Sequence, residues 1–104
     1  MINLDTYRNT AGREFAISAQ EEVYRQDDTA WGFVYQIVDE NNSVFKLLLV
    51  VMKSFYPQEE DAKRLVAGDG LTKVRSLLDS ERNGELMYPY PDFCRGWVVN
   101  PLHE

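Results

Sequence analysis

The chain has 104 residues, of which 17 are acidic and 11 basic, so its formal net charge is −6. The negative net charge disfavours direct binding to nucleic acid or to an anionic membrane, because a protein binds either of them through a basic surface. Cys94 is the single cysteine, which excludes an internal disulfide and, with one histidine, leaves too few ligands for a soft-metal site.

The N-terminal third of the chain is expected to contain one strand. Residues 1–12 mix polar and apolar side chains, lack the pattern of a signal peptide, and are expected to be a short lead-in. Residues 14–24 alternate between apolar and polar side chains, which favours a half-buried strand. Phe15, Ala19 and Val23 also fit a helical stripe, so a helix remains the alternative there.

The middle of the chain predicts an antiparallel meander. After a turn at residues 25–29, residues 31–38 alternate again and are rich in aromatic and β-branched side chains, which is typical of a strand. A hairpin loop at residues 39–43 leads to residues 44–53, which are apolar on both faces and are therefore expected in the middle of the sheet. The short connections favour pairing of consecutive strands.

Two consecutive helices are expected after the meander. The acids at residues 59–61 favour a helix start, and Gly68 is expected to end that helix. Asp69 is expected to cap a second helix, which residues 83–84, an Asn-Gly pair, would end. The sequence therefore predicts one α+β domain over residues 1–104, with an antiparallel three- to four-stranded sheet (meander) and two consecutive helices packed on one face.

The C-terminal twenty residues hold three prolines, which exclude another helix. Residues 96–99 can add one short final strand. The aromatics of this segment either cover the second face of the sheet, which carries Leu48, or form an interface. A homodimer would also cover that face.

No catalytic constellation stands out. Cys94 would need a base, and His103 is the one imidazole and lies near the C-terminus. Residues 68–73 resemble a phosphate loop only superficially, because Asp69 puts a carboxylate where an anion would sit. The acidic pairs lack the spacing of a calcium-binding loop. We therefore expect no cofactor and no metal, and a non-enzymatic role.

Two features favour protein binding. Acidic pairs fall in both expected hairpin turns, which would place two acidic rims at opposite ends of the sheet. An aromatic residue beside such a rim, or a proline-stiffened aromatic segment, suits an Arg- or Lys-rich protein partner. The candidate partner-binding residues are Glu21, Glu22, Asp27, Asp28, Trp31, Asp39, Glu40, Tyr88, Tyr90, Phe93 and Trp97.

The leading functional hypothesis is a small acidic module that occludes a protein partner with a basic surface. An inhibitor or immunity-type protein acting on a nucleic-acid-handling enzyme or a toxin fits this description. One alternative is an assembly subunit or adaptor working through a homo- or hetero-oligomeric interface. Another is a small-ligand-binding protein or a carboxylate-based enzyme. The expected location is the cytoplasm.

Overall fold

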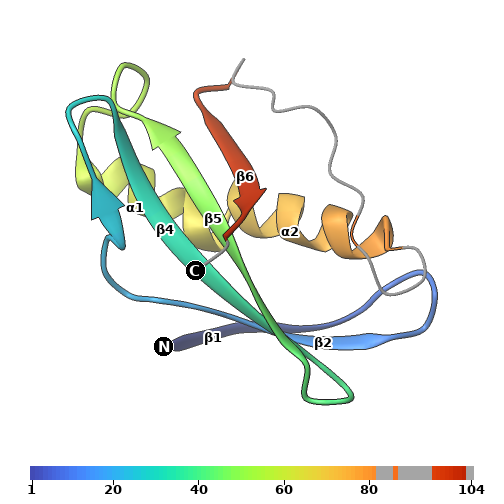
Figure 1. Cartoon of the computed structure of the whole chain (residues 1–104). Helices are drawn as coiled ribbons and strands as arrows, with labels where there is room; N and C mark the ends of the chain where they lie inside the picture. The colour runs from blue at the N-terminus through green and yellow to red at the C-terminus, as the bar shows by residue number, and fades with distance from the viewer. Residues whose placement is uncertain (82–85, 87–94, 103–104) are drawn as a thin grey trace.

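The structure, a computed structural model, describes residues 1–81, 86 and 95–102. These residues form an α+β fold in which two helices lie on one side of an antiparallel sheet (Figure 1). The elements are β1 (Ile2–Arg8), β2 (Glu14–Ala19), β3 (Arg25–Gln26), β4 (Ala30–Asp39), β5 (Val44–Met52), α1 (Glu59–Ala67), α2 (Asp69–Asp79) and β6 (Trp97–Pro101).

The strand order confirms the meander and extends it. Strands β1, β2, β4 and β5 pair antiparallel in that order, and β6 returns after the helices to pair with β5. The short β3 pairs with β4 beyond the end of β2. Residues 20–24 therefore form a loop between β2 and β3, which both pair with β4. The residues described thus form a six-stranded sheet, larger than the three to four strands expected.

The expected lead-in at residues 1–12 is wrong, because β1 occupies most of it. A β-bulge between Asn3 and Asp5 shifts the pairing register with β2. Such a bulge changes which side chains share a face, so the strand loses the period-two pattern by which sequence identifies it. Asp5 consequently lies on the helix-covered face, where its carboxylate pairs with Arg75 at 2.8 Å.

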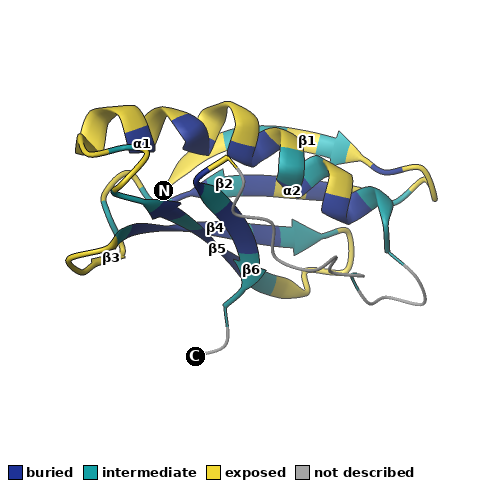
Figure 2. Ribbon diagram, turned by 90° about the horizontal axis from the view of Figure 1, so that it is seen from above, coloured by how far each residue is buried: buried dark blue, intermediate teal, exposed yellow. Residues whose placement is uncertain are grey.

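The core lies between the helices and one face of the sheet, where dark-blue buried segments of both layers meet (Figure 2). The alternation in residues 31–38 and 44–53 places its apolar side chains on this face, as the sequence predicted. Residues 14–19 are a strand and not a helix, and they contribute to the same face. Its fully buried members include Ile17, Phe33, Tyr35, Ile37, Leu47, Leu49 and Val51 from the sheet and Val74, Leu77 and Leu78 from α2.

The second face of the sheet is also partly buried within one copy of the chain. Val34 and Leu48 lie there, and Val98 of β6 joins them because it pairs directly with Val50. Val50 and Met52 are half-buried. The apolar character of this face therefore does not require a second copy of the chain.

The helix junction differs from the sequence prediction. Gly68 both ends α1 and precedes α2, and its carbonyl accepts a hydrogen bond from Thr72 N at 3.1 Å. Asp69 is the first residue of α2, and no side-chain hydrogen bond caps that helix. The prediction that Asp69 is the cap is thus wrong, since the two helices follow one another as a single bent rod without a loop that would need one.

Tyr35 fixes the bend of this rod to the sheet. Its hydroxyl is fully buried and donates to the carbonyl of Val66, at 2.7 Å, in the last turn of α1. Burial raises the pKa of this phenol well above its ordinary value. Gly70 makes the approach possible, because a Cβ there would lie 2.4 Å from the Tyr35 hydroxyl.

Tyr35→Phe should lower the free energy of unfolding by about 2 kcal/mol, because it leaves the buried Val66 carbonyl without a partner. Urea denaturation at neutral pH measures the change. Tyr56→Phe is the matched control, since its hydroxyl forms no hydrogen bond with the residues described here and its removal should change stability little. Equal effects of the two substitutions would show that the Tyr35 contact does not hold the helices.

Candidate protein-binding surface

The two acidic turns lie at opposite ends of β4. Residues 27–29 precede this strand of 10 residues, and residues 39–43 begin at its last residue, Asp39, and form the turn after it. At roughly 3.3 Å per residue the separation is about 30 Å. The two turns therefore cannot contribute to one small site, and each is best considered with its own neighbours.

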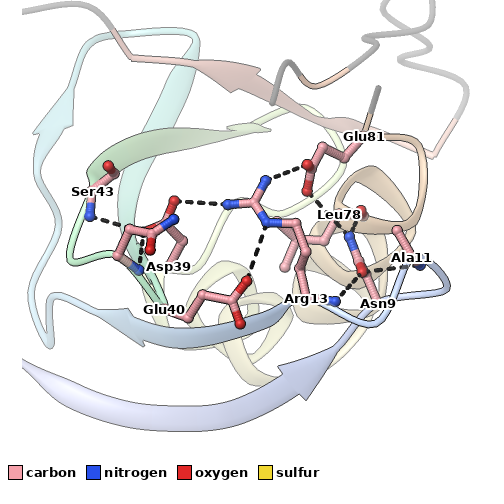
Figure 3. Close-up of polar contacts among 9 residues, drawn as sticks. Asn9, Ala11, Arg13, Asp39, Glu40, Ser43, Leu78 and Glu81 are labelled. Atoms are coloured by element: carbon pink, nitrogen blue, oxygen red, sulfur yellow. Dashed lines mark hydrogen bonds and ion pairs between the residues drawn. The ribbon is translucent and has the colours of Figure 1, made fainter. Parts of the chain in front are cut away.

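Asp39 is committed to the fold. One carboxylate oxygen accepts hydrogen bonds from Asn41 N and Ser43 N, both at 2.9 Å, and so shapes the β4–β5 turn. Asn42 in that turn has a positive φ of 63°, a conformation that Asn tolerates well. The other carboxylate oxygen accepts from Arg13 at 2.8 Å (Figure 3). The Asp39 carboxylate thus has little capacity left for a partner.

Arg13 gathers three acids from distant parts of the chain. Its guanidinium pairs with Asp39, lies 3.6 Å from Glu40, and donates to Glu81 just after α2 (Figure 3). The hydrogen bond to Glu81 is the first cause of the raised pKa of Arg13. We call Asn9, Arg13, Asp39, Glu40 and Glu81 the Arg13 cluster. It joins the β1–β2 turn, the β4–β5 turn and the end of the helical rod.

Asn9 is the buried member of this cluster, with 5% of its surface exposed. Its amide donates to the Leu78 carbonyl at 2.9 Å, and its side-chain oxygen accepts from the backbone N–H groups of Ala11 and Arg13. One of the carbonyls left open at the C-terminus of α2 is satisfied in this way. The helix ends at Asp79, before the Asn-Gly pair at 83–84 that was expected to end it and that lies outside the described residues.

Asn9→Ala should lower the free energy of unfolding by about 2 kcal/mol, because it leaves the N–H groups of Ala11 and Arg13 without their acceptor and removes the buried hydrogen bond to the Leu78 carbonyl. Asn41→Ala removes an exposed amide from the neighbouring turn and should cost less than about 0.5 kcal/mol. Chemical denaturation of both variants gives the comparison. A near-neutral Asn9→Ala would contradict the role given to this cluster.

The opposite end of β4 is organised around Asp27. We call residues 20–29 together with residues 53–56 the β3 end of the sheet. One oxygen of Asp27 accepts hydrogen bonds from Thr29 N, Thr29 Oγ1 and Ala30 N, at 2.7–2.9 Å. These donors, those of Thr29 first, and the nearby Lys53 lower the pKa of the Asp27 carboxyl. Asp27 therefore shapes its turn as Asp39 does.

Trp31 is buried, with 9% of its surface exposed. Its indole N–H donates to the Tyr56 carbonyl at 2.9 Å, which ties β4 to the connection between β5 and α1. The ammonium of Lys53 lies 4.3 Å from the centre of the indole ring and also donates to Gln26. A cation of the chain itself therefore already lies over a face of the indole ring, so this face is not free to receive a cation of a partner.

Glu21, Glu22 and Asp28 differ from the other acidic candidates. All three are exposed, and none forms an ion pair or hydrogen bond with a described residue. Glu21 and Glu22 lie in the loop at residues 20–24, and Asp28 lies in the turn that Asp27 shapes. Among the candidate residues, the acids without a partner in the described part of the chain therefore all lie at the β3 end.

The remaining candidates are in the C-terminal segment. Trp97 is half-buried at the start of β6 and packs against the core, and its indole nitrogen is buried without a hydrogen-bond partner among the residues described. Tyr88, Tyr90, Phe93, Cys94 and His103 lie outside the described residues.

The described part of the chain carries no group of three or more acidic, Cys or His side chains that could hold a metal ion. Neither of its helices is long and apolar enough to cross a membrane. No family model, curated protein or solved structure matches the chain.

The turn at Asp27 gives a pH-dependent prediction. A folded-state pKa below the ordinary value of 3.8 means that the charged carboxylate stabilises the fold above that pH, and that this contribution is lost as the pH falls through the lowered pKa. Asp27→Ala should therefore be less stable than the natural protein at pH 6, with a smaller difference at pH 2. Denaturation curves at both pH values test this, with Asp28→Ala as the control. A difference that does not depend on pH would contradict it.

Proposed function

We propose that this protein is a small non-enzymatic binding module that occludes the basic surface of a protein partner. The single observation that carries the proposal is the position of the free acids. Glu21, Glu22 and Asp28 are exposed at one end of the sheet and have no pair among the described residues, whereas Asp39 is held by Arg13. An inhibitor or immunity-type protein, directed at a nucleic-acid-handling enzyme or a toxin, is the class we favour.

The physical basis is electrostatic complementarity. A surface that normally receives phosphates carries Lys and Arg, and unpaired carboxylates can occupy it in their place. Long-range attraction between such surfaces mainly increases the association rate and weakens as salt screens it. The net charge of −6 contributes to this attraction, and the free acids orient it. We propose the cytoplasm as its location, since the single cysteine gives no sign of a disulfide-dependent fold.

The β3 end is suited to such a contact because its backbone is held in place. Lys53 N donates to the Thr29 carbonyl at 2.8 Å, and Trp31 is bonded to Tyr56, so the two connections of this end are fastened to each other. A surface fixed before binding loses less conformational entropy when the complex forms. Trp31 therefore supports the contact from inside, and Asp28 takes part in it directly.

The test compares a variant in which the three acids at the β3 end are neutralised with a variant in which three acids elsewhere are neutralised. Glu21→Gln/Glu22→Gln/Asp28→Asn removes three negative charges at the β3 end. Glu14→Gln/Glu40→Gln/Asp69→Asn removes three exposed charges away from it. We expect the first variant to associate about tenfold more slowly with the partner captured from the encoding organism, with a flatter salt dependence. The second variant should remain close to the natural protein.

An association rate that neither triple variant changes would refute the electrostatic proposal. Equal slowing by both would show that only the total charge matters and would contradict the assignment to the β3 end. Stopped-flow or surface-plasmon measurements at two salt concentrations separate these results, because they report the association rate directly.

A further inference from the structure

Phe55 is a large apolar side chain that the fold leaves exposed, at 60% of its surface, in the connection between β5 and α1. Its position is nevertheless fixed. The backbone N–H groups of Phe55 and Tyr56 both donate to the Met52 carbonyl, at 3.1 and 3.0 Å. On the other side, the base of the ring lies so close to Gly96 that a Cβ there would be 2.5 Å from Phe55 Cβ and Cγ.

Phe55 also belongs to the β3 end, where the free acids lie. The Lys53 N–H is bonded to the Thr29 carbonyl, so the chain segment that carries Phe55 is adjacent to the turn that carries Asp28. Figures 1 and 2 show the β3–β4 turn and the start of α1 at the same end of the molecule. An exposed aromatic ring and Asp28, an exposed acid without a pair among the described residues, thus lie on adjacent segments of one end of the sheet.

An exposed apolar residue needs no functional explanation by itself. Val44 illustrates this, because it is 55% exposed at the opposite end of the sheet, in the hairpin that contains Asp39. Both residues have a backbone held by hydrogen bonds, but the segment of Phe55 is bonded to the turn that carries Asp28, an exposed acid with no pair among the described residues, whereas Asp39, in the hairpin of Val44, is held by Arg13. A rigid aromatic beside uncompensated charge has the composition of an interface hot spot.

We propose that Phe55 is the apolar anchor of the binding surface at the β3 end. The partner would carry an apolar pocket that receives the ring, with Lys or Arg on the side of the pocket that meets Asp28. This inference rests on the proposed function and adds to it the part of the contact that salt does not screen. The ring would mainly slow dissociation, and the free acids would mainly speed association.

The experiment uses the full chain, immobilised, and a lysate of the encoding organism. Proteins that the natural chain retains and the triple variant of Glu21, Glu22 and Asp28 loses are identified by mass spectrometry, and one is purified as the probe. We expect Phe55→Ala to weaken binding of that probe about 30-fold, chiefly through faster dissociation. Val44→Ala is the matched control and should change the affinity less than about twofold.

Phe55→Leu guards against a folding defect, because it keeps apolar bulk at the site and should lie between the natural protein and Phe55→Ala. A charge-dependent partner that binds Phe55→Ala as tightly as the natural chain would overturn this inference and leave the proposed function standing. Capture that depends on Phe55 but ignores the charge variant would overturn the proposed function and the basic rim of the pocket. Capture of no protein that distinguishes the variants would overturn both.

Discussion

The hydrogen bond from Tyr35 to the Val66 carbonyl is the contact on which the arrangement of the two layers depends. It joins the middle of the central strand β4 to the point at which the helical rod bends, and Gly70 lets the two approach. Because β4 also carries an acidic turn at each end, its docking fixes where both turns lie. The buried phenol thus orients the strand whose pairing with its neighbours places the candidate surface.

The acids of this chain perform two different physical tasks. Asp27 and Asp39 accept backbone hydrogen bonds within their own turns, and Asp39 also pairs with Arg13. Such carboxylates stabilise the fold and are poorly available to another molecule. Glu21, Glu22 and Asp28 have no such partners among the described residues, so net charge overstates the number of acids that could meet a partner.

Much of the fold could be predicted from the sequence because local patterns determine it. Alternation predicted residues 31–38 and 44–53 as neighbouring strands, and the acids at residues 59–61 with Gly68 predicted the start and the end of the first helix. The strand at residues 2–8 was missed, since a bulge removes its alternation. The binding surface was predicted only in part: acidic turns are visible in sequence, but which acids are paired depends on contacts such as that between Arg13 and Glu81, 68 positions apart. Phe55 gave no signal, because exposure is not encoded in residue type.

The most direct test of this account is a hydrogen-exchange footprint of the complex with the captured partner. Backbone amides in residues 20–29 and 53–56 should exchange more slowly in the complex than in the free protein. Amides in residues 9–13 and 39–43, around the Arg13 cluster, should be unchanged, since the acids there are paired within the chain. Protection centred on residues 9–13 and 39–43, with none at the β3 end, would contradict the account.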